Sequence, residues 1–176
     1  MRGFKTLLDL HSDGVGVGFN FGAQFHPTST LALGLSYRPH SVIHSEGSAS
    51  GDASAQLQAL GGGFAQFDPI FRYDAGVRND LPQIASAAIE WQVCPQVRLI
   101  GGIDWINWHD AFDRLVIDLS RGSNAAINGV VGSDAMTDIA PLRWRDQYVF
   151  RSGIEYAATD HFTLRAGYNY ARSAVP

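Results

Sequence analysis

Cysteine, charge and long apolar runs are all scarce in this chain of 176 residues. The single cysteine, Cys94, excludes an intramolecular disulfide framework and any zinc or iron–sulfur site built from several cysteines. Thirteen basic residues against seventeen acidic ones give a net charge of -4, without the clustered positive charge that a nucleic-acid binder needs. No uninterrupted apolar stretch approaches the roughly 18 residues of a membrane-spanning helix. A nucleic-acid partner and helical membrane insertion are therefore excluded.

The first nine residues do not form a complete export signal. Arg2 and Lys5 are basic, but only Leu7 and Leu8 follow before Asp9, whereas a secretory signal needs an apolar region of roughly 7 to 15 residues. The sequence therefore predicts either a cytoplasmic protein or part of a longer exported protein whose start is missing. With 45% hydrophobic and only 17% charged residues, the chain is too apolar to be disordered, and its length suits one domain over residues 1–176.

Strand periodicity dominates the sequence. Apolar residues alternate with small or polar ones from Val15 to Phe25, and the alternation resumes at residues 31–37 after a turn at 26–29. The same pattern predicts four more strands, with short turns at Pro95 and at residues 159–161, over residues 85–93, 97–105, 142–156 and 162–170. The chain is thus expected to be all-β and antiparallel, with about six strands.

Two stretches that lack sustained periodicity are predicted to be long loops. Residues from about 45 to 79 are rich in Gly, Ser, Ala and Asp, and the second stretch spans about 120 to 141. Short turns and long loops therefore alternate, which is typical of outer-membrane barrels. The phenylalanines of the first loop are predicted either to help capture a ligand or to pack as a loop cluster: Phe64, Phe67 and Phe71.

The two faces of the predicted strands differ in chemistry. Glycines share one face with charged residues, as a hydrated barrel interior would, while Leu, Val, Phe and Tyr occupy the other face. The candidates for the interior face are Arg38, Glu90, Asp104, Arg151 and Arg165. The arginines either steer a carboxylate ligand or, as we favour, pair with acidic residues across neighbouring strands. Interfacial aromatic girdles are expected to include Trp105, Trp144, Tyr156 and Tyr170.

Residues that often carry catalysis or bind metals are poorly placed for either task. On a strand, His40 and His44 would stand roughly 13 Å apart, too far to share a zinc ion. His109 and Asp110 are adjacent and would point to opposite faces of a strand. No G-x-S-x-G motif supplies a nucleophile. We therefore expect no catalytic site, no metal site and no cofactor.

Periodicity alone does not show which face of a strand is exposed to water. A transmembrane barrel places the apolar face against lipid, whereas a soluble β-sandwich or lipocalin-like binding module packs that face into a core. A truncated, non-functional gene product is a third interpretation. The pattern favours the barrel and leaves the other two open.

Four segments of the chain resemble the FadL/TodX family of outer-membrane proteins. The first is the Gly/aromatic strand DGVGVGFNFGA at 13–23 with LGLSYR at 33–38, and the second is LP at 81–82 after a long loop. The third is WINW at 105–108, with Phe112 behind it. The fourth runs from WRD at 144–146 through GIEY and LRAGY to the closing SAVP at 173–176, where the family usually has Ser-Pro-Val-Pro.

The resemblance implies a fold, a location and a function. Family members are antiparallel up-and-down transmembrane β-barrels of around fourteen strands with an N-terminal hatch, and they take up long-chain fatty acids and other hydrophobic compounds by binding and diffusion. With about six strands and no counterpart of the hatch, this chain is expected to be part of such a barrel in the bacterial outer membrane. The implied partners are hydrophobic small molecules such as fatty acids, and outer-membrane lipid. No ligand-binding residue is carried over.

Overall fold

Two compact units, each containing one β-sheet, make up the computed structural model, which describes residues 8–63 and 67–176. Unit 1 combines Met1–Gly16, Val42–Asn79 and Leu115–Pro141. Unit 2 combines Val17–Ser41, Asp80–Arg114 and Leu142–Pro176. Phe64 and the basic residues discussed above for an export signal lie outside the described residues. The assignment of residues 1–176 to one domain stays a prediction.

Unit 2 contains the six strands that the periodicity predicts. They are ordered β11-β10-β7-β6-β3-β2, and all five neighbouring pairs are antiparallel. The strands are β2 (Phe21–Thr28), β3 (Leu31–Arg38), β6 (Ile84–Cys94), β7 (Val97–Ile106), β10 (Gln147–Thr159) and β11 (Phe162–Ala171). Each strand pairs with the next of the six along the chain, so the up-and-down topology is confirmed. In the described residues the sheet is not closed, because β2 and β11 are its edge strands.

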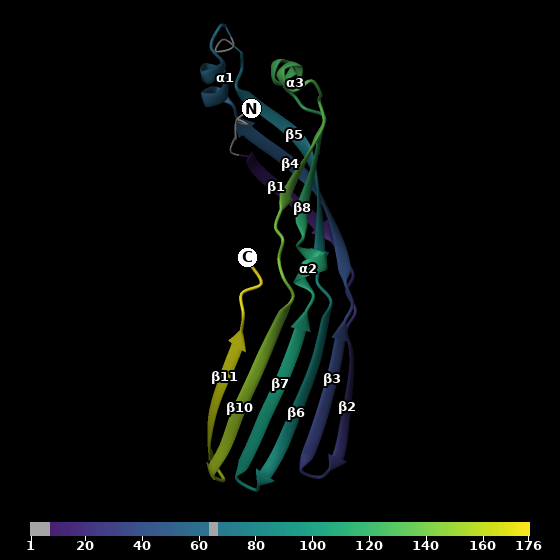
Figure 1. Cartoon of the computed structure of the whole chain (residues 1–176), viewed down its shortest axis with the longest axis vertical. Coiled ribbons are helices and arrows are strands. Elements are labelled where there is room, and N and C mark those ends of the chain that lie inside the picture. The colour runs from purple at the N-terminus through teal and green to yellow at the C-terminus, as the bar shows by residue number, and fades with distance from the viewer. Residues whose placement is uncertain (1–7, 64–66) are drawn as a thin grey trace. The chain divides into compact units, whose positions relative to one another are not determined.

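All three short turns of unit 2 lie at the same end of its sheet (Figure 1). Neighbouring turns are tied together by backbone hydrogen bonds, because Gln92 N donates to Thr30 O at 2.7 Å and Ala157 N donates to Gln96 O at 2.8 Å. The two long connections, from β3 to β6 and from β7 to β10, leave the opposite end. The predicted asymmetry between short and long connections is confirmed.

The long connections are not the irregular loops that the sequence led us to expect. Residues 45–79 and 120–141 contain most of unit 1, whose five strands follow the order β1-β4-β5-β8-β9. Those strands are β1 (Leu8–Val15), β4 (Ser41–Asp52), β5 (Ile70–Leu81), β8 (Arg114–Ser120) and β9 (Met136–Pro141). Unit 1 also holds helices α1 (Ser54–Leu60) and α3 (Ala125–Val131), whereas the single-turn helix α2 (Trp108–Ala111) belongs to unit 2.

Small side chains explain why β4 escaped prediction. β4 reads SVIHSEGSASGD, and its fully buried residue is Ala49, so the contrast between apolar and polar positions is weak. At Gly47 the strands approach so closely that a Cβ atom would collide with the carbonyl oxygen of His11 on β1. Glycine is therefore required there for packing, and this region of β4 is a strand in spite of its loop-like composition.

Two predicted strand boundaries were also wrong. The alternation from Val15 to Phe25 is not one strand, because Val15 ends β1 and pairs with His44 of unit 1, while β2 begins only at Phe21. The last long strand begins at Gln147 rather than at residue 142. Before it, Arg143 has a left-handed backbone with φ of 54°, and its N–H donates to the carbonyl oxygen of Asp113. This local turn takes residues 142–146 out of the strand.

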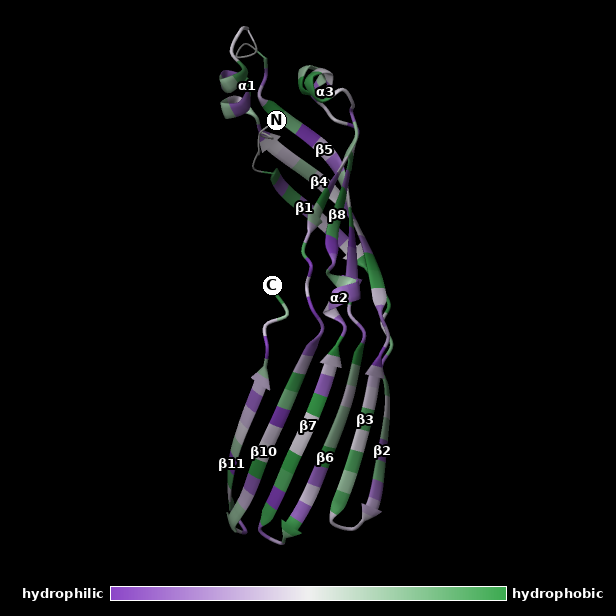
Figure 2. Ribbon diagram, in the orientation of Figure 1, coloured by the Kyte–Doolittle hydropathy of each residue, from purple (hydrophilic) through white to green (hydrophobic). Residues whose placement is uncertain are grey.

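The apolar face of the unit 2 sheet is not covered by a second layer. Hydrophobic and hydrophilic residues alternate along its strands (Figure 2), and large side chains stay open, with Phe25 66% and Tyr168 68% exposed. In the part of unit 2 that the structure describes, the only buried residues are Pro82, Asn107, Ala111 and Ala174, and none of them lies within a strand of the sheet. A soluble sandwich would pack this face into a core, so the arrangement of the unit 2 sheet is not that of a sandwich.

Unit 1, in contrast, has a hydrophobic core. Its buried residues are Ala49, Ala53, Leu57, Phe71, Tyr73, Ala75 and Leu119. They come from β4, α1, β5 and β8 and from the residue that precedes α1. Across residues 8–63 and 67–176, we find no helix with the length and hydropathy needed to cross a membrane.

Candidate functional site

An apolar pocket of about 720 Å³ opens in unit 1. Its wall is formed by both helices of the unit together with residues of β1, β5, β8 and β9. Most lining residues are apolar or aromatic: Leu8, Ala53, Leu57, Leu60, Phe71, Tyr73, Leu119, Ile127, Val130, Val131 and Met136. The remaining three are Gln56, Thr137 and Asp138. Pockets of about 300–1,000 Å³ with mainly apolar walls are typical small-molecule sites.

Tyr73 anchors the inner wall of this pocket. It lies on β5 with 1% of its surface exposed, and its ring meets Phe71 edge to face at 5.8 Å. The hydroxyl donates to Asn128 Oδ1 of α3 at 3.1 Å. Burial, and next the carboxylate of Asp134, raise the pKa of the Tyr73 hydroxyl, so the proton for this hydrogen bond is retained at neutral pH. Tyr73 therefore joins β5 to α3.

Helix α3 is fixed at its N-terminus by Asn124. The side-chain oxygen of Asn124 accepts hydrogen bonds from the N–H groups of Ala126 and Ile127, which satisfies two of the free donors of the first turn. Its amide nitrogen donates to the carbonyl oxygens of Asp68 and Ile70 at 2.7 and 2.9 Å. One side chain therefore both caps the helix and attaches it to the chain segment that enters β5.

Helix α1 is held at its start by the carboxylate of Asp52. Asp52 Oδ1 accepts from the backbone N–H of Ser54 at 2.7 Å and also from the Ser54 hydroxyl. The hydroxyl donor, followed by the backbone donor, lowers the pKa of Asp52. The N–H of Ala53 donates to the carbonyl oxygen of Pro69 at 2.9 Å. These contacts position Leu57 and Leu60 against the pocket.

The sequence contained signals for this pocket that we did not use. Ile127, Val130 and Val131 follow the i, i+3, i+4 spacing of one helix face, and Phe71 and Tyr73 alternate as strand residues do. Of the three loop phenylalanines, Phe71 lies in the core and lines the pocket, which fits both predicted roles. Phe67 is 41% exposed and does not line the pocket.

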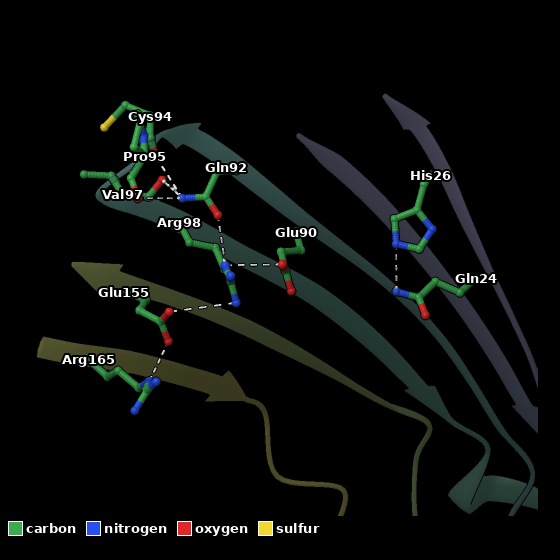
Figure 3. Close-up of polar contacts among 10 residues, drawn as sticks. All are labelled: Gln24, His26, Glu90, Gln92, Cys94, Pro95, Val97, Arg98, Glu155 and Arg165. Carbon is green, nitrogen blue, oxygen red and sulfur yellow. Dashed lines mark hydrogen bonds and ion pairs between the residues drawn. The ribbon is translucent and has the colours of Figure 1, made fainter. Parts of the chain in front are cut away.

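Charged side chains form a ladder on the glycine-bearing face of the unit 2 sheet, near the short turns. Arg98 is its central residue, because Nε lies 3.3 Å from Glu90 Oε1 and Nη1 lies 3.8 Å from Glu155 Oε1 (Figure 3). Arg98 Nε also donates to Gln92 Oε1 at 3.3 Å. The antiparallel register places Gln92, Arg98 and Glu155 directly opposite one another on β6, β7 and β10.

The ladder continues to the edge strand and has a second rung farther from the turns. Arg165 of β11 lies opposite Glu155 and donates from Nε to Glu155 Oε2 at 2.5 Å. In the second rung, Arg151 Nη2 donates to Asp104 Oδ1 at 2.6 Å. A Cβ atom at Gly102 would lie 3.5 Å from Arg151 Nη2, an ordinary contact distance, and 3.3 Å from the carbonyl oxygen of Ala87.

Four of the five charged residues predicted for the interior face therefore take part in cross-strand ion pairs: Glu90, Asp104, Arg151 and Arg165. The fifth, Arg38, lies at the end of β3 opposite Ile84 and makes no ion pair among the described residues. The predicted pairing of arginines with Glu90, Asp104 and Glu155 across strands is confirmed. A ligand-binding role for these residues stays a prediction.

The Arg151→Gln variant is expected to take up ligand as the wild type does and to unfold at a lower temperature. It removes the partner of Asp104, and because Arg151 is half exposed, the loss is about 0.2–1 kcal/mol. Uptake by intact cells and heat-induced unfolding on gels would measure the two effects. Arg172→Gln is the matched control, since Arg172 makes no ion pair among the described residues. Reduced uptake with unchanged heat resistance would instead indicate that Arg151 steers ligand.

Aromatic residues mark the end of the apolar face near the long connections. Tyr37, Trp105 and Tyr148 share one row of the antiparallel register with Ala85. The indole N–H of Trp105 donates to Asp146 Oδ2 at 3.1 Å. Trp144, which was also expected in a girdle, instead packs against Trp108 and Phe112, with ring centroids 5.3 and 4.8 Å away.

The histidines and acidic residues weighed as metal or catalytic groups have local structural contacts. His40 Nε2 lies 3.3 Å from Asp80 Oδ1, and Asp110 Oδ2 accepts from the amide of Asn107 at 2.6 Å. The N–H of His109 donates to Asp146 Oδ1 at 3.2 Å. No three His, Cys, Asp or Glu side chains are grouped to hold a metal ion within residues 8–63 and 67–176.

Comparison with known proteins connects this geometry to one family. The family model described as outer membrane protein transport protein (OMPP1/FadL/TodX) matches residues 1–176. No curated protein matches the chain.

Solved structures share the fold at low sequence identity. A Pseudomonas aeruginosa FadL homologue superposes with a TM-score of 0.74 and 20% identity, covering 97% of this chain and 37% of its own. The Ralstonia pickettii toluene transporter TbuX superposes with a TM-score of 0.68 and 21% identity, and the match covers 89% of this chain and 36% of TbuX. The Pseudomonas putida toluene transporter TodX superposes with a TM-score of 0.66 and 21% identity, and the match covers 92% of this chain and 36% of TodX. The chain thus spans somewhat more than a third of the length of these structures.

Proposed function

Because this chain belongs to the OMPP1/FadL/TodX family of bacterial outer membrane transport proteins, we propose that its protein takes up hydrophobic small molecules across the outer membrane. The observation that carries the proposal is the apolar pocket of unit 1, which has the volume and wall of a small-molecule site. Uptake proceeds by binding and diffusion, without a covalent step and without a cofactor.

The sheet of unit 2 serves as a segment of the barrel wall. Its apolar face contacts lipid, and its glycine-bearing face, with the charged ladder, faces the interior. Because these charges are paired with one another, we infer that they stabilise the wall and do not bind an anionic ligand. In outer-membrane barrels the short turns lie in the periplasm and the longer connections outside the cell. Apart from Leu8 of β1, the residues of the pocket belong to the long connections, so we expect them to meet ligand first.

Two ligand classes suit this proposal. Long-chain fatty acids follow from the family resemblance of the sequence, and two of the structurally similar proteins are named as toluene transporters. Both classes are apolar over most of their surface, and their burial in the pocket would gain about 25 cal/mol for each Å² of apolar area removed from water. Hydrophobic contact is therefore the common basis of capture.

The Val130→Asp variant tests whether the pocket captures ligand. Val130 lines the pocket on α3 but is 53% exposed, so the substitution leaves the folded core intact. A carboxylate in the apolar wall costs about 1–3 kcal/mol when an apolar ligand covers it, which corresponds to binding that is weaker by roughly fivefold to more than a hundredfold. Binding of a radiolabelled hydrocarbon to outer membranes that contain the protein measures this change.

Ile70→Asp provides the matched control. Ile70 is 55% exposed on β5 and does not line the pocket, so the same charge is added to the same unit away from the ligand. The control should bind as the wild type does. Equal binding by Val130→Asp and the wild type would refute a role of this pocket in capture.

A further inference from the structure

One negative charge lies in the wall of the apolar pocket. Among the lining residues that the structure describes, Asp138 is the only one with an ionisable acidic or basic group other than the Tyr73 hydroxyl. It follows Thr137 on β9, and both residues line the pocket and are exposed. The wall in the described residues therefore offers a carboxylate and no cation to an entering molecule.

Two further carboxylates act on residues of the same wall. Asp118 Oδ1 accepts a hydrogen bond from the Thr137 hydroxyl at 2.6 Å, so it lies directly behind a lining residue. Asp134 is close enough to Tyr73 to raise the pKa of its hydroxyl. Arg72 and Arg121, which are close in sequence to lining residues, do not line the pocket, and Arg121 forms an ion pair with Asp74. The electrostatic surroundings of the pocket are therefore acidic.

An acidic surround separates two kinds of hydrophobic ligand. A fatty-acid carboxylate that enters must give up hydration and approach charges of its own sign, and the wall described offers it no cationic partner. An uncharged molecule of the same length gains the same apolar burial without either cost. The difference is largest for a headgroup that lies near Asp138.

On this basis we propose that the pocket selects uncharged hydrophobic molecules over carboxylates, with Asp138 as the residue that sets the preference. The inference rests on the proposed capture function and narrows its ligand class to hydrocarbons, alcohols and similar neutral compounds. Of the two classes that suit the family, it disfavours ionised fatty acids at this pocket.

The test compares 1-dodecanol with dodecanoate, which differ in the charged headgroup and share the apolar chain. Binding of each probe is measured to the protein purified from outer membranes and placed in lipid nanodiscs, with empty nanodiscs subtracted. The wild type should bind dodecanol about threefold to tenfold more tightly than dodecanoate, since Asp138 is exposed and partly screened. Added salt should reduce this ratio.

Variants at Asp138 assign the preference to one residue. Asp138→Asn should reduce the ratio of dodecanol affinity to dodecanoate affinity, and Asp138→Lys should reverse this preference. Asp160→Asn, in the turn between β10 and β11, is the matched control and should leave the ratio unchanged.

The possible failures are distinguishable. Equal binding of the two probes by the wild type, or a ratio that neither Asp138 variant changes, would overturn the charge selectivity and leave the capture function in place. Failure of both probes to bind would overturn the capture function itself, and the selectivity with it.

Discussion

The Ile89→Arg variant should assemble poorly in the outer membrane and lose about 2–4 kcal/mol of stability. Ile89 lies near the middle of the apolar face of unit 2, opposite Leu33 of β3 and Gly101 of β7 in the antiparallel register. Its Cγ2 atom lies over Gly101, 3.3 Å from where a Cβ would stand. An arginine there would carry its charge into the hydrocarbon region. Urea unfolding in lipid vesicles, together with the folded fraction in isolated membranes, would measure the effect.

The adjacent Ala88→Arg variant is the control, because it adds the same charge at nearly the same depth in the membrane. Ala88 points to the opposite face, between Gly34 and Gly102 in the register, where small neighbours leave room. Glu90, two residues away on the same face, offers a carboxylate for the new charge. The control should therefore assemble nearly as the wild type does. Similar losses in both variants would argue that the apolar face does not contact lipid.

The Tyr73→Ala variant should destabilise unit 1 by about 3–5 kcal/mol, the range found when large aromatic residues are removed from cores. It removes the contact with Phe71, opens a cavity at the least exposed large side chain of the core and deletes the hydrogen bond to Asn128. Ligand capture should fall as well, because β5 and α3 would then be joined through Asn124 without the contact of Tyr73 with Asn128. Limited proteolysis of the long connections should accelerate more than a hundredfold when local opening controls cleavage.

The Tyr73→Phe variant separates the ring from the hydroxyl. It keeps the packing against Phe71 and loses only the hydrogen bond to Asn128, so the expected cost is about 1 kcal/mol. Cleavage within unit 2 serves as the internal reference in both variants. If Tyr73→Ala is cleaved no faster than the wild type, the core around Tyr73 does not hold this unit together.

The sheet of unit 2 was predictable because each strand contrasts two faces. Apolar and polar residues alternate sharply around Leu33, Ile89 and Ile154, and short turns at Pro95 and Asp160 separate neighbouring strands. The same contrast misled us between Val15 and Phe21. The alternation continues there through residues that make no strand pairing, because the chain passes from the sheet of unit 1 to that of unit 2.

Unit 1 and its pocket were harder to predict, since both helices have only seven residues and β4 is built largely from small residues. Ala49 is completely buried in a run that reads as a flexible loop, and Gly47 is needed for close approach rather than for a turn. The pocket combines α1, β5 and α3, which lie far apart in sequence. Periodicity reports the face of one element and carries no information on which distant element covers it.

The ladder on the interior face was partly predictable. Period two placed the arginines with Glu90, Asp104 and Glu155 on one face, and pairing across strands followed from that placement. The sequence did not show that Arg98 would bridge two carboxylates, because this depends on the register of three strands.

The arrangement of short and long connections also determines where chain entropy opposes formation of the sheet. In three of its five strand pairings, β2–β3, β6–β7 and β10–β11, the partners are joined by a short turn, so closing each hairpin orders few residues. The other two, β3–β6 and β7–β10, must close loops that contain most of unit 1. Most of the entropic cost of loop closure therefore falls on the β3–β6 and β7–β10 pairings. Structure that forms early in the long connections would lower this cost.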